Sequence, residues 1–374
     1  MAATGPDFGR LRNLPPEIHE IFNDEDSREE FLGFSDVNDD SDDDFDAENA
    51  QGWQQVNADH QRRQPPPFTG NPGFQVDVSA DPSFLDFVFL MIPADSFDVM
   101  SLQTNKYARD YLSGTQLLPH SRFVGAVLAM GLVIHEDISD YWSTDLVLAT
   151  PFFPSIMSRD RFLNVLLFFH LANNDNYIPR GRDGYDPLFK LGAVYRNIVR
   201  NFRDVWQPNK NICVDEGMVP FRGNIHFKVH NPDKQDKYGF KAYEVCDSSN
   251  GYCCKFELYT VRSDETTSGK GKTYDLVMGL MDGYLRKGHV LYVDNYYTSP
   301  ILFYDLYKED TLACGTSRHR KGIPARIKET KLKEKGEKLV MVKGPLMVMK
   351  YKDRKDVVML STIHSAKNID LGDL

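Results

Sequence analysis

The spacing of apolar residues changes abruptly near Pro208, and this change narrows the choice of fold. From residue 81 to residue 207, apolar side chains recur every three or four positions, as on amphipathic helices, and prolines interrupt the repeats. After Pro208, apolar runs of strand length surround one helical stretch at residues 273–285. This order predicts an α-helical domain followed by an α/β domain built on a mixed sheet.

Two of the predicted strands end in an aspartate. Residues 211–214 are followed by Asp215, and the nearly continuous apolar run 289–293 is followed by Asp294. Between them, residues 240–246 and 252–260 flank a glycine-containing loop and predict a hairpin. Side chains at the ends of adjacent buried strands converge at one edge of a sheet, so we expect the two carboxylates to lie close together.

Two converging carboxylates repel each other unless a cation lies between them. Mg²⁺ takes a few carboxylates together with water and phosphate oxygens. Two such ions, about 4 Å apart, activate the attacking oxygen and stabilise the leaving oxygen of a phosphoryl transfer. An aspartate at a strand end also commonly starts a turn, and spacing alone leaves both interpretations open.

The net charge of −10 averages two opposite regions. Residues 1–50 hold sixteen acids and three bases, whereas the other 324 residues hold thirty-eight acids and forty-one bases. Residues 318–355 alone hold fourteen bases and four acids. An acidic tail on a basic body favours a nucleic-acid partner. The tail either solvates the chain or competes for the basic surface, and the sequence does not separate these alternatives.

The chain has no sign of a membrane or secreted protein. Its longest apolar run, residues 123–134, is short of the ~20 residues that a spanning helix needs, and the N-terminus lacks a signal pattern. The five cysteines form no CxxC pair and have no histidine at metal-ligand spacing. We therefore expect a cytosolic or nuclear protein without a disulfide framework or a zinc site.

The residues around both acids resemble motifs of the piggyBac family of DDE transposases. The run DEGMVPFRG at residues 215–223 is similar to the family pattern DE-x-M-x-x-F-K/R-G, and DNYYTS at 294–299 is similar to DN-Y/F-Y/F-TS. Residues 232–248 resemble a strand pair that lies between these motifs, although Asp233 and Gln235 replace the usual small residues or proline.

Further family landmarks occur in the same order along the chain. CGTSRHRKGIP at residues 314–324 is similar to a CGT segment, and TNKYA at 104–108, YWST at 141–144 and MSRDRF at 157–162 are similar to landmarks of the helical region. The resemblance covers about residues 80–365.

The resemblance implies a ribonuclease-H-like catalytic core that uses three aspartates and Mg²⁺ to cut transposon ends and join them to TTAA sites. It assigns Asp215 and Asp294 as catalytic and metal-binding residues. In the family, the third aspartate follows a β-rich insertion, and a Cys/His-rich zinc domain comes last. The printed sequence reaches Leu374 without either feature. We therefore expect a C-terminally truncated member whose chain alone is inactive.

These interpretations divide the chain into four parts: a disordered acidic tail (1–78), an α-helical dimerisation and DNA-binding region (79–208), the first part of a ribonuclease-H-like core (209–312) and an incomplete, basic β-rich insertion (313–374). The insertion is expected to contain strands at 339–342, 346–351 and 357–361 with unprotected edges. The implied partners are DNA and a second copy of the chain. We expect a nuclear location, no membrane contact and no small-molecule substrate.

Basic residues near the two acids are candidates for phosphate contacts, and each neutralised phosphate steepens the salt dependence of binding. A solvated basic face remains the alternative for any single residue. The candidates are Arg222, Lys228, Lys237 and Lys241 around the first acid, and Arg318, Arg320 and Lys321 after the second.

Three functions compete: a DNA transposase, a domesticated DNA-binding or dimerising protein that does not cut, and a metal-dependent hydrolase with another substrate. The basic segment and the series of motifs argue against the hydrolase. The first two share every residue of the sequence, and composition does not divide them.

Overall fold

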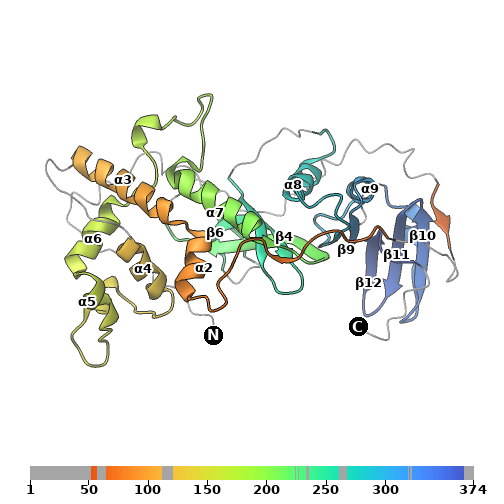
Figure 1. Cartoon of the computed structure of the whole chain (residues 1–374). Coiled ribbons are helices and arrows are strands. Elements are labelled where there is room, and N and C mark those ends of the chain that lie inside the picture. The colour runs from red at the N-terminus through yellow and green to blue at the C-terminus, as the bar shows by residue number, and fades with distance from the viewer. Residues whose placement is uncertain are drawn as a thin grey trace. The chain divides into compact units, whose positions relative to one another are not determined.

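The computed structural model describes residues 52–56, 65–111, 121–223, 225, 227–232, 236–260, 268–318, 320 and 322–365. They fall into two compact units (Figure 1). The first unit contains Val78–Asn201 and Met218–Phe240, and the second contains residues 52–56, 65–77, Phe202–Gly217 and the described residues from Lys241 onward. Within these described ranges, no helix combines the length and the apolar character needed to cross a membrane.

The first unit is mainly helical, as the spacing of apolar residues predicted. Ser158 is the N-cap of a helix and accepts a hydrogen bond from the Arg161 amide. Phe162 of this helix is fully buried and shares a core with Phe123 and Phe153, which are almost fully and fully buried. The helices are α2 (Phe84–Met91), α3 (Ala94–Tyr111), α4 (Ser121–Met130), α5 (Phe152–Ile156), α6 (Arg159–Phe168) and α7 (Gly192–Val205), whose last residues belong to the second unit.

The second unit is built on a long mixed sheet. Its strand order is β1-β10-β11-β12-β9-β8-β4-β6, and β7 also pairs with β6. Strand β8 runs parallel to β4 and β9, whereas β1 and β10, β10 and β11, β11 and β12, β12 and β9, and β6 and β7 pair antiparallel. The strands are β1 (Gln54–Gln55), β4 (Asn211–Pro220), β6 (Tyr238–Asp247), β7 (Cys253–Leu258), β8 (Val290–Val293), β9 (Leu312–Thr316), β10 (Lys338–Lys343), β11 (Leu346–Lys352) and β12 (Asp356–Ser361). The residues of β4 from Met218 onward and those of β6 up to Phe240 belong to the first unit.

Smaller elements complete the two units. Strand β2 (Gly73–Phe74) pairs with β3 (Trp206–Gln207) as a separate two-stranded sheet of the second unit. Within the first unit, β5 (Val229–His230) pairs with the N-terminal end of β6. The short helix α10 (Ala325–Glu329) buries Ile327 in the core of the second unit.

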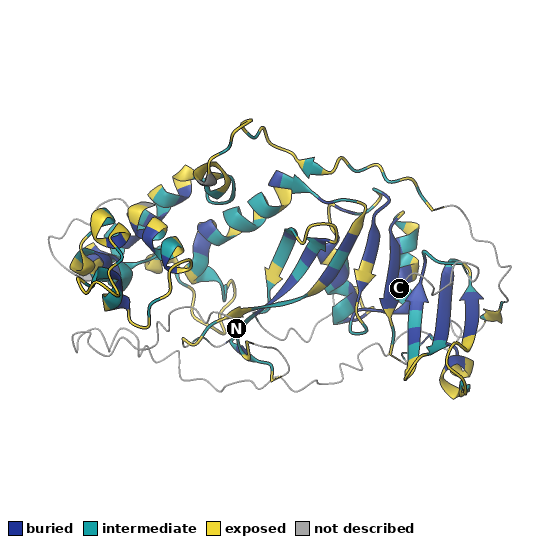
Figure 2. Ribbon diagram, turned by 90° about the horizontal axis from the view of Figure 1, so that it is seen from below, coloured by how far each residue is buried: buried dark blue, intermediate teal, exposed yellow. Residues whose placement is uncertain are grey.

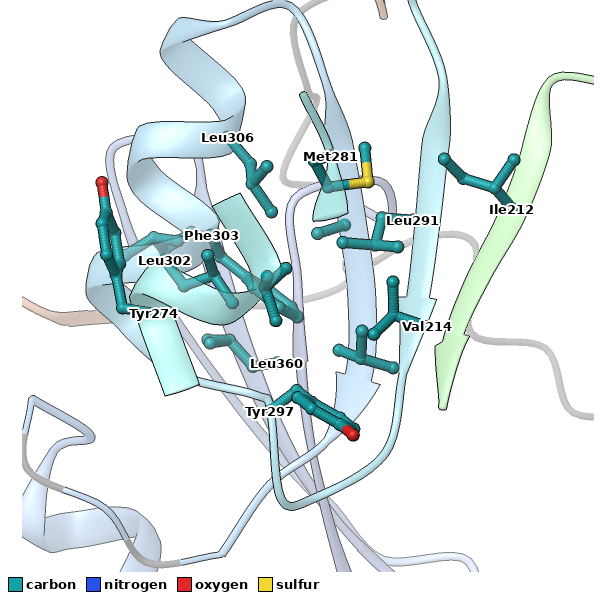
Figure 3. Close-up of a cluster of buried hydrophobic side chains, with 14 of the residues drawn as sticks. Ile212, Val214, Tyr274, Met281, Leu291, Tyr297, Leu302, Phe303, Leu306 and Leu360 are labelled. Carbon is teal, nitrogen blue, oxygen red and sulfur yellow. The ribbon is translucent and has the colours of Figure 1, made fainter. Parts of the chain in front are cut away.

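Helices α8 (Lys272–Leu280) and α9 (Pro300–Lys308) supply most of the helical core of the second unit. Figure 3 shows Leu302, Phe303 and Leu306 of α9 gathered with side chains from the sheet. On β4, the core residues Ile212 and Val214 alternate with more exposed ones, so this part of the strand is buried mainly on one face. On β8, Val290, Leu291 and Val293 are all buried and Tyr292 is exposed; Figure 2 colours the sheet by burial. The core thereby fixes which side chains of β4 and β8 point away from the helices.

Strands β10, β11 and β12 extend the sheet, and β12 joins it by pairing with β9. The sequence predicted unprotected edges here and no order before residue 79. The structure differs on both points, because Gln54 and Gln55 form β1 and pair with Val342 and Met341 of β10. Trp53 adds an indole hydrogen bond to the carbonyl of Gly322 at 3.0 Å. A strand from the N-terminal region thus covers part of an edge that would otherwise invite association.

Candidate active site at the ends of two parallel strands

The two predicted acids lie next to each other in the sheet. Strands β4 and β8 pair in parallel, and the last pair of their register joins Val214 to Val293. Asp215 and Asp294 are the next residues of the two strands, and both are exposed. The predicted convergence of the acids is therefore reproduced by the register. Strand β4 does not end at Asp215 as predicted but continues to Pro220, because β6 still pairs with it after β8 has ended.

Backbone groups hold both carboxylates. The Glu216 amide donates to Oδ1 of Asp215 at 2.8 Å, and the Tyr296 amide donates to Oδ1 of Asp294 at 2.8 Å. The Thr298 hydroxyl donates to the Asp294 carbonyl at 2.8 Å and fixes the turn after β8. An ionised carboxylate has about four acceptor positions, so each retains capacity for a cation. Two exposed, oriented carboxylates fit a hard divalent ion such as Mg²⁺.

A third carboxylate, Glu244, lies on β6 opposite Asp215 of β4. The amide of Ser248 donates to the carbonyl of Asn211 at 3.0 Å, which starts an antiparallel register with Cys213 opposite Cys246 and Asp215 opposite Glu244. Sequence reasoning missed Glu244 because nothing local marks it. The available signal was the hydrogen-bonding register of β4 and β6: counting residues along both strands from the hairpin loop after β6 places Glu244 opposite Asp215.

Behind the acids lies a buried ion pair. The ammonium of Lys241 is 3.3 Å from Oε1 of Glu216, and the two side chains are 8% and 15% exposed. The same ammonium lies 4.8 Å from the ring centre of Tyr243 and 5.5 Å from that of Tyr296. Burial raises the pKa of Glu216, and the charge of Lys241 opposes this shift. Lys241, a sequence candidate for DNA contact, is therefore placed to orient the segment around Asp215.

Two of the predicted basic residues contact the turn after Asp294. Nε of Arg318 donates to Oδ1 of Asn295 at 2.8 Å, and the guanidinium of Arg320 donates to the Tyr296 carbonyl. Arg318 is exposed and Arg320 is half-buried. The structure thus brings two guanidinium groups beside the second acid. Lys321 lies outside the described residues.

The remaining basic candidates belong to the first unit. The Arg222 guanidinium lies 5.1 Å from the centre of the Tyr238 ring, the Lys228 ammonium donates to the Gly223 carbonyl at 2.9 Å, and Lys237 is exposed. These residues share one unit, whereas Asp215 and Asp294 belong to the other.

Asp247, which lies in the stretch 232–248 that resembles the family's strand pair, is held in a network of hydrogen bonds. Its carboxylate accepts hydrogen bonds from the Trp206 indole, from the amide and side chain of Asn209, and from the amide and hydroxyl of Ser249, at 2.7–3.2 Å. Burial would raise its pKa, but these donors outweigh burial and lower the pKa to about 2. Asp247 thereby ties the end of β6 to the segment before β4.

Comparisons with known proteins identify the family of the chain. A family model of DDE transposases, described as Transposase IS4, matches residues 87–371. The human PiggyBac transposable element-derived protein 5 is 22% identical over 292 residues, which make up 72% of this chain and 53% of the human protein. The chain thus spans about half the length of that relative.

A solved structure shares the fold. The cryo-EM structure of a piggyBac transposase synaptic complex with hairpin DNA matches with a TM-score of 0.65 and 23% identity, over 74% of this chain and 60% of that chain. The match confirms the predicted ribonuclease-H-like α/β fold. The chain therefore belongs to the DDE transposase family described as Transposase IS4, as a piggyBac-type member.

Proposed function

We propose that this chain carries two carboxylates of the metal site of a DNA transposase that cleaves and joins DNA strands. The observation that supports this most strongly is the parallel register of β4 and β8, which sets Asp215 beside Asp294. The acids after Asp294 lack the glycine-rich context of the family's third aspartate, so the proposal assigns no further acid.

In this proposal, Asp215 and Asp294 hold Mg²⁺. The bound ion supplies activation of the attacking oxygen and stabilisation of the leaving oxygen. The chain's own contribution is positioning: the amides of Glu216 and Tyr296 orient the two carboxylates, and the Glu216–Lys241 pair fixes the strand that bears Asp215. Misplacement of such groups by about 1 Å can cost two orders of magnitude in rate.

DNA is the proposed substrate, with cleavage and joining at TTAA sites. Arg318 and Arg320, anchored next to Asp294, are suited to contact phosphates on either side of the reacting bond. Arg222, Lys228 and Lys237 are proposed as further phosphate contacts. Because its proposed substrate is DNA, we propose a nuclear location for the protein. The helical first unit is proposed to mediate homodimerisation.

Metal-dependent DNA binding tests this proposal. We expect the affinity of the chain for a TTAA-containing duplex to rise when EDTA is replaced by Ca²⁺, which bridges carboxylates and phosphates. Asp215→Asn and Asp294→Asn should abolish this increment and leave the metal-independent, salt-sensitive binding intact. Asp353→Asn is the matched control, since this exposed acid pairs with Lys335 and is predicted to have no role. An increment that survives in both site variants would overturn the assignment.

A nicking assay separates the transposase from a domesticated protein that binds DNA without cutting it. Mg²⁺-dependent nicking of supercoiled plasmid that disappears in Asp215→Asn supports an enzyme. Metal-dependent binding without nicking by any form of the protein supports the non-catalytic alternative.

A further inference from the structure

Several cysteines of the second unit lie on the face of the sheet that α8 and α9 do not cover. The neighbours of Cys213, Cys246 and Cys253 along their strands, among them Val214, Val245 and Cys254, point into the helix-covered core. Because side chains alternate along a strand, Cys213 and Cys246 share the opposite face, and Cys253 joins them because it pairs directly with Cys246. They are half-buried, so small ions can reach them.

The hairpin brings two of the thiols side by side. Cys246 pairs directly with Cys253, and the register of the hairpin shifts between Val245 and Cys246. Such a bulge turns a side chain away from its regular direction. Cys213 lies on the other side of Cys246, with its sulfur 3.7 Å from the Cys246 carbonyl. Two cysteines separated by a loop in the sequence thus become neighbours in space.

A carboxylate completes the group. Among the residues that the structure describes, one ligand atom each from Glu244, Cys246 and Cys253 forms a set whose members all lie within 4.8 Å of one another. Two sulfurs on a tetrahedral zinc ion are about 3.8 Å apart, given a Zn–S bond of about 2.3 Å. Side-chain rotations that move the ligand atoms by about 1 Å would therefore bring them to zinc-coordination distances.

We propose that Glu244, Cys246 and Cys253 form a binding site for one thiophilic divalent ion of the zinc class, with water in the fourth position. Two thiolates and one carboxylate select a borderline or soft ion, whereas Asp215 and Asp294 offer oxygen ligands to a hard ion. The sequence predicted no zinc site because it lacks a CxxC pair, but the hairpin supplies the proximity that spacing does not. The ion would tie β6 to β7 at the bulge.

Co²⁺ titration of the metal-free, fully reduced chain tests the site. We expect one equivalent to bind with a thiolate-to-cobalt charge-transfer band, release protons from the thiols, and be displaced by Zn²⁺. Cys246→Ser and Cys253→Ser should each remove most of the band. Cys254→Ala is the matched control: Cys254 adjoins Cys253 in sequence but is buried in the core, so the band should remain.

Two further measurements keep the test independent of folding and of the proposed function. Asp294→Asn should leave the band unchanged, because Asp294 supplies no sulfur ligand; loss of the band in this variant would show that cobalt binding depends on the Asp215–Asp294 pair and would overturn an independent site. In the unaltered chain, Zn²⁺ should protect Cys246 and Cys253 from alkylation, as read by mass spectrometry, and leave Cys213 more reactive. Absence of a thiolate band at one equivalent, or alkylation of Cys253 unaffected by Zn²⁺, would overturn the site.

Discussion

Asp247 gives the sharpest stability prediction, through the replacement Asp247→Asn. The carboxylate has no exposed surface and accepts its hydrogen bonds from groups that only donate in this geometry, including the Trp206 indole. An asparagine turns an NH₂ group toward some of these donors and removes the charge. Lowering the pKa from 3.8 to about 2 corresponds to a stabilisation of about 2 kcal/mol at neutral pH. We therefore expect Asp247→Asn to lower the free energy of unfolding by about 2–3 kcal/mol.

The pH dependence has a defined sign. The folded pKa of Asp247 lies below its unfolded value, so its stabilisation is present above about pH 4 and is lost as the pH falls toward about 2. Asp247→Asn should remove this part of the acid dependence. Urea unfolding at pH 7 and at pH 3 measures both effects, and the difference between variant and parent should shrink at the lower pH.

The Trp206 indole provides a local readout. Its N–H donates to Oδ2 of Asp247 at 3.2 Å, so its ¹H–¹⁵N resonance, assigned with Trp206→Phe, should shift as Asp247 titrates. Asp353→Asn, which alters an exposed acid, should leave both the resonance and the unfolding midpoint unchanged. The reasoning is refuted if Asp247→Asn unfolds at the parent's urea midpoint, or if the indole resonance titrates near pH 4.

Three further predictions concern the neighbourhood of the acids. Lys241→Met leaves the buried Glu216 carboxylate without its cation and should lower the free energy of unfolding, measured in urea, by about 3 kcal/mol. Adding Glu216→Gln should restore most of this loss, whereas effects that simply add would contradict a buried ion pair. Gly217→Ala places a Cβ 2.2 Å from Oε1 of Glu244, so the flexible Glu244 side chain must move away. The melting temperature should therefore change little, while the affinity for Co²⁺ falls several-fold. An unchanged affinity for Co²⁺ would argue against Glu244 as a ligand. Arg318→Ala should lower DNA affinity and reduce the salt slope by about 0.9 for one lost phosphate contact, whereas an unchanged slope would remove it from the DNA surface.

Local patterns were sufficient for much of the fold. The run before Asp294 became β8, and the glycine-containing loop became the β6–β7 hairpin, because continuous apolar runs and turn residues act within a few positions. The helix predicted at 273–285 ends at Leu280, since Gly279 and Gly283 lie near its C-terminal end and Gly283 adopts a positive φ of 91°.

Contacts between residues that are far apart in the sequence could not be predicted from local patterns. The pairing of β1 with β10, the burial of Lys241 against Glu216, and the grouping of Glu244 with two cysteines all join residues from different strands. No local pattern encodes such contacts, because they follow from sheet register. The two acids were found only because each ends an apolar strand within a recognisable motif.

The most direct test of the account is paramagnetic broadening by Mn²⁺ in the free chain, without DNA. A two-carboxylate site binds weakly, and broadening detects weak binding through the amides of Glu216 and Tyr296, which donate to the two carboxylates. We predict that both amides broaden first, that Mg²⁺ competes, and that Asp215→Asn or Asp294→Asn abolishes the effect at both amides. Broadening confined to one amide, or equal broadening in Asp294→Asn, would contradict a shared metal site at the ends of β4 and β8.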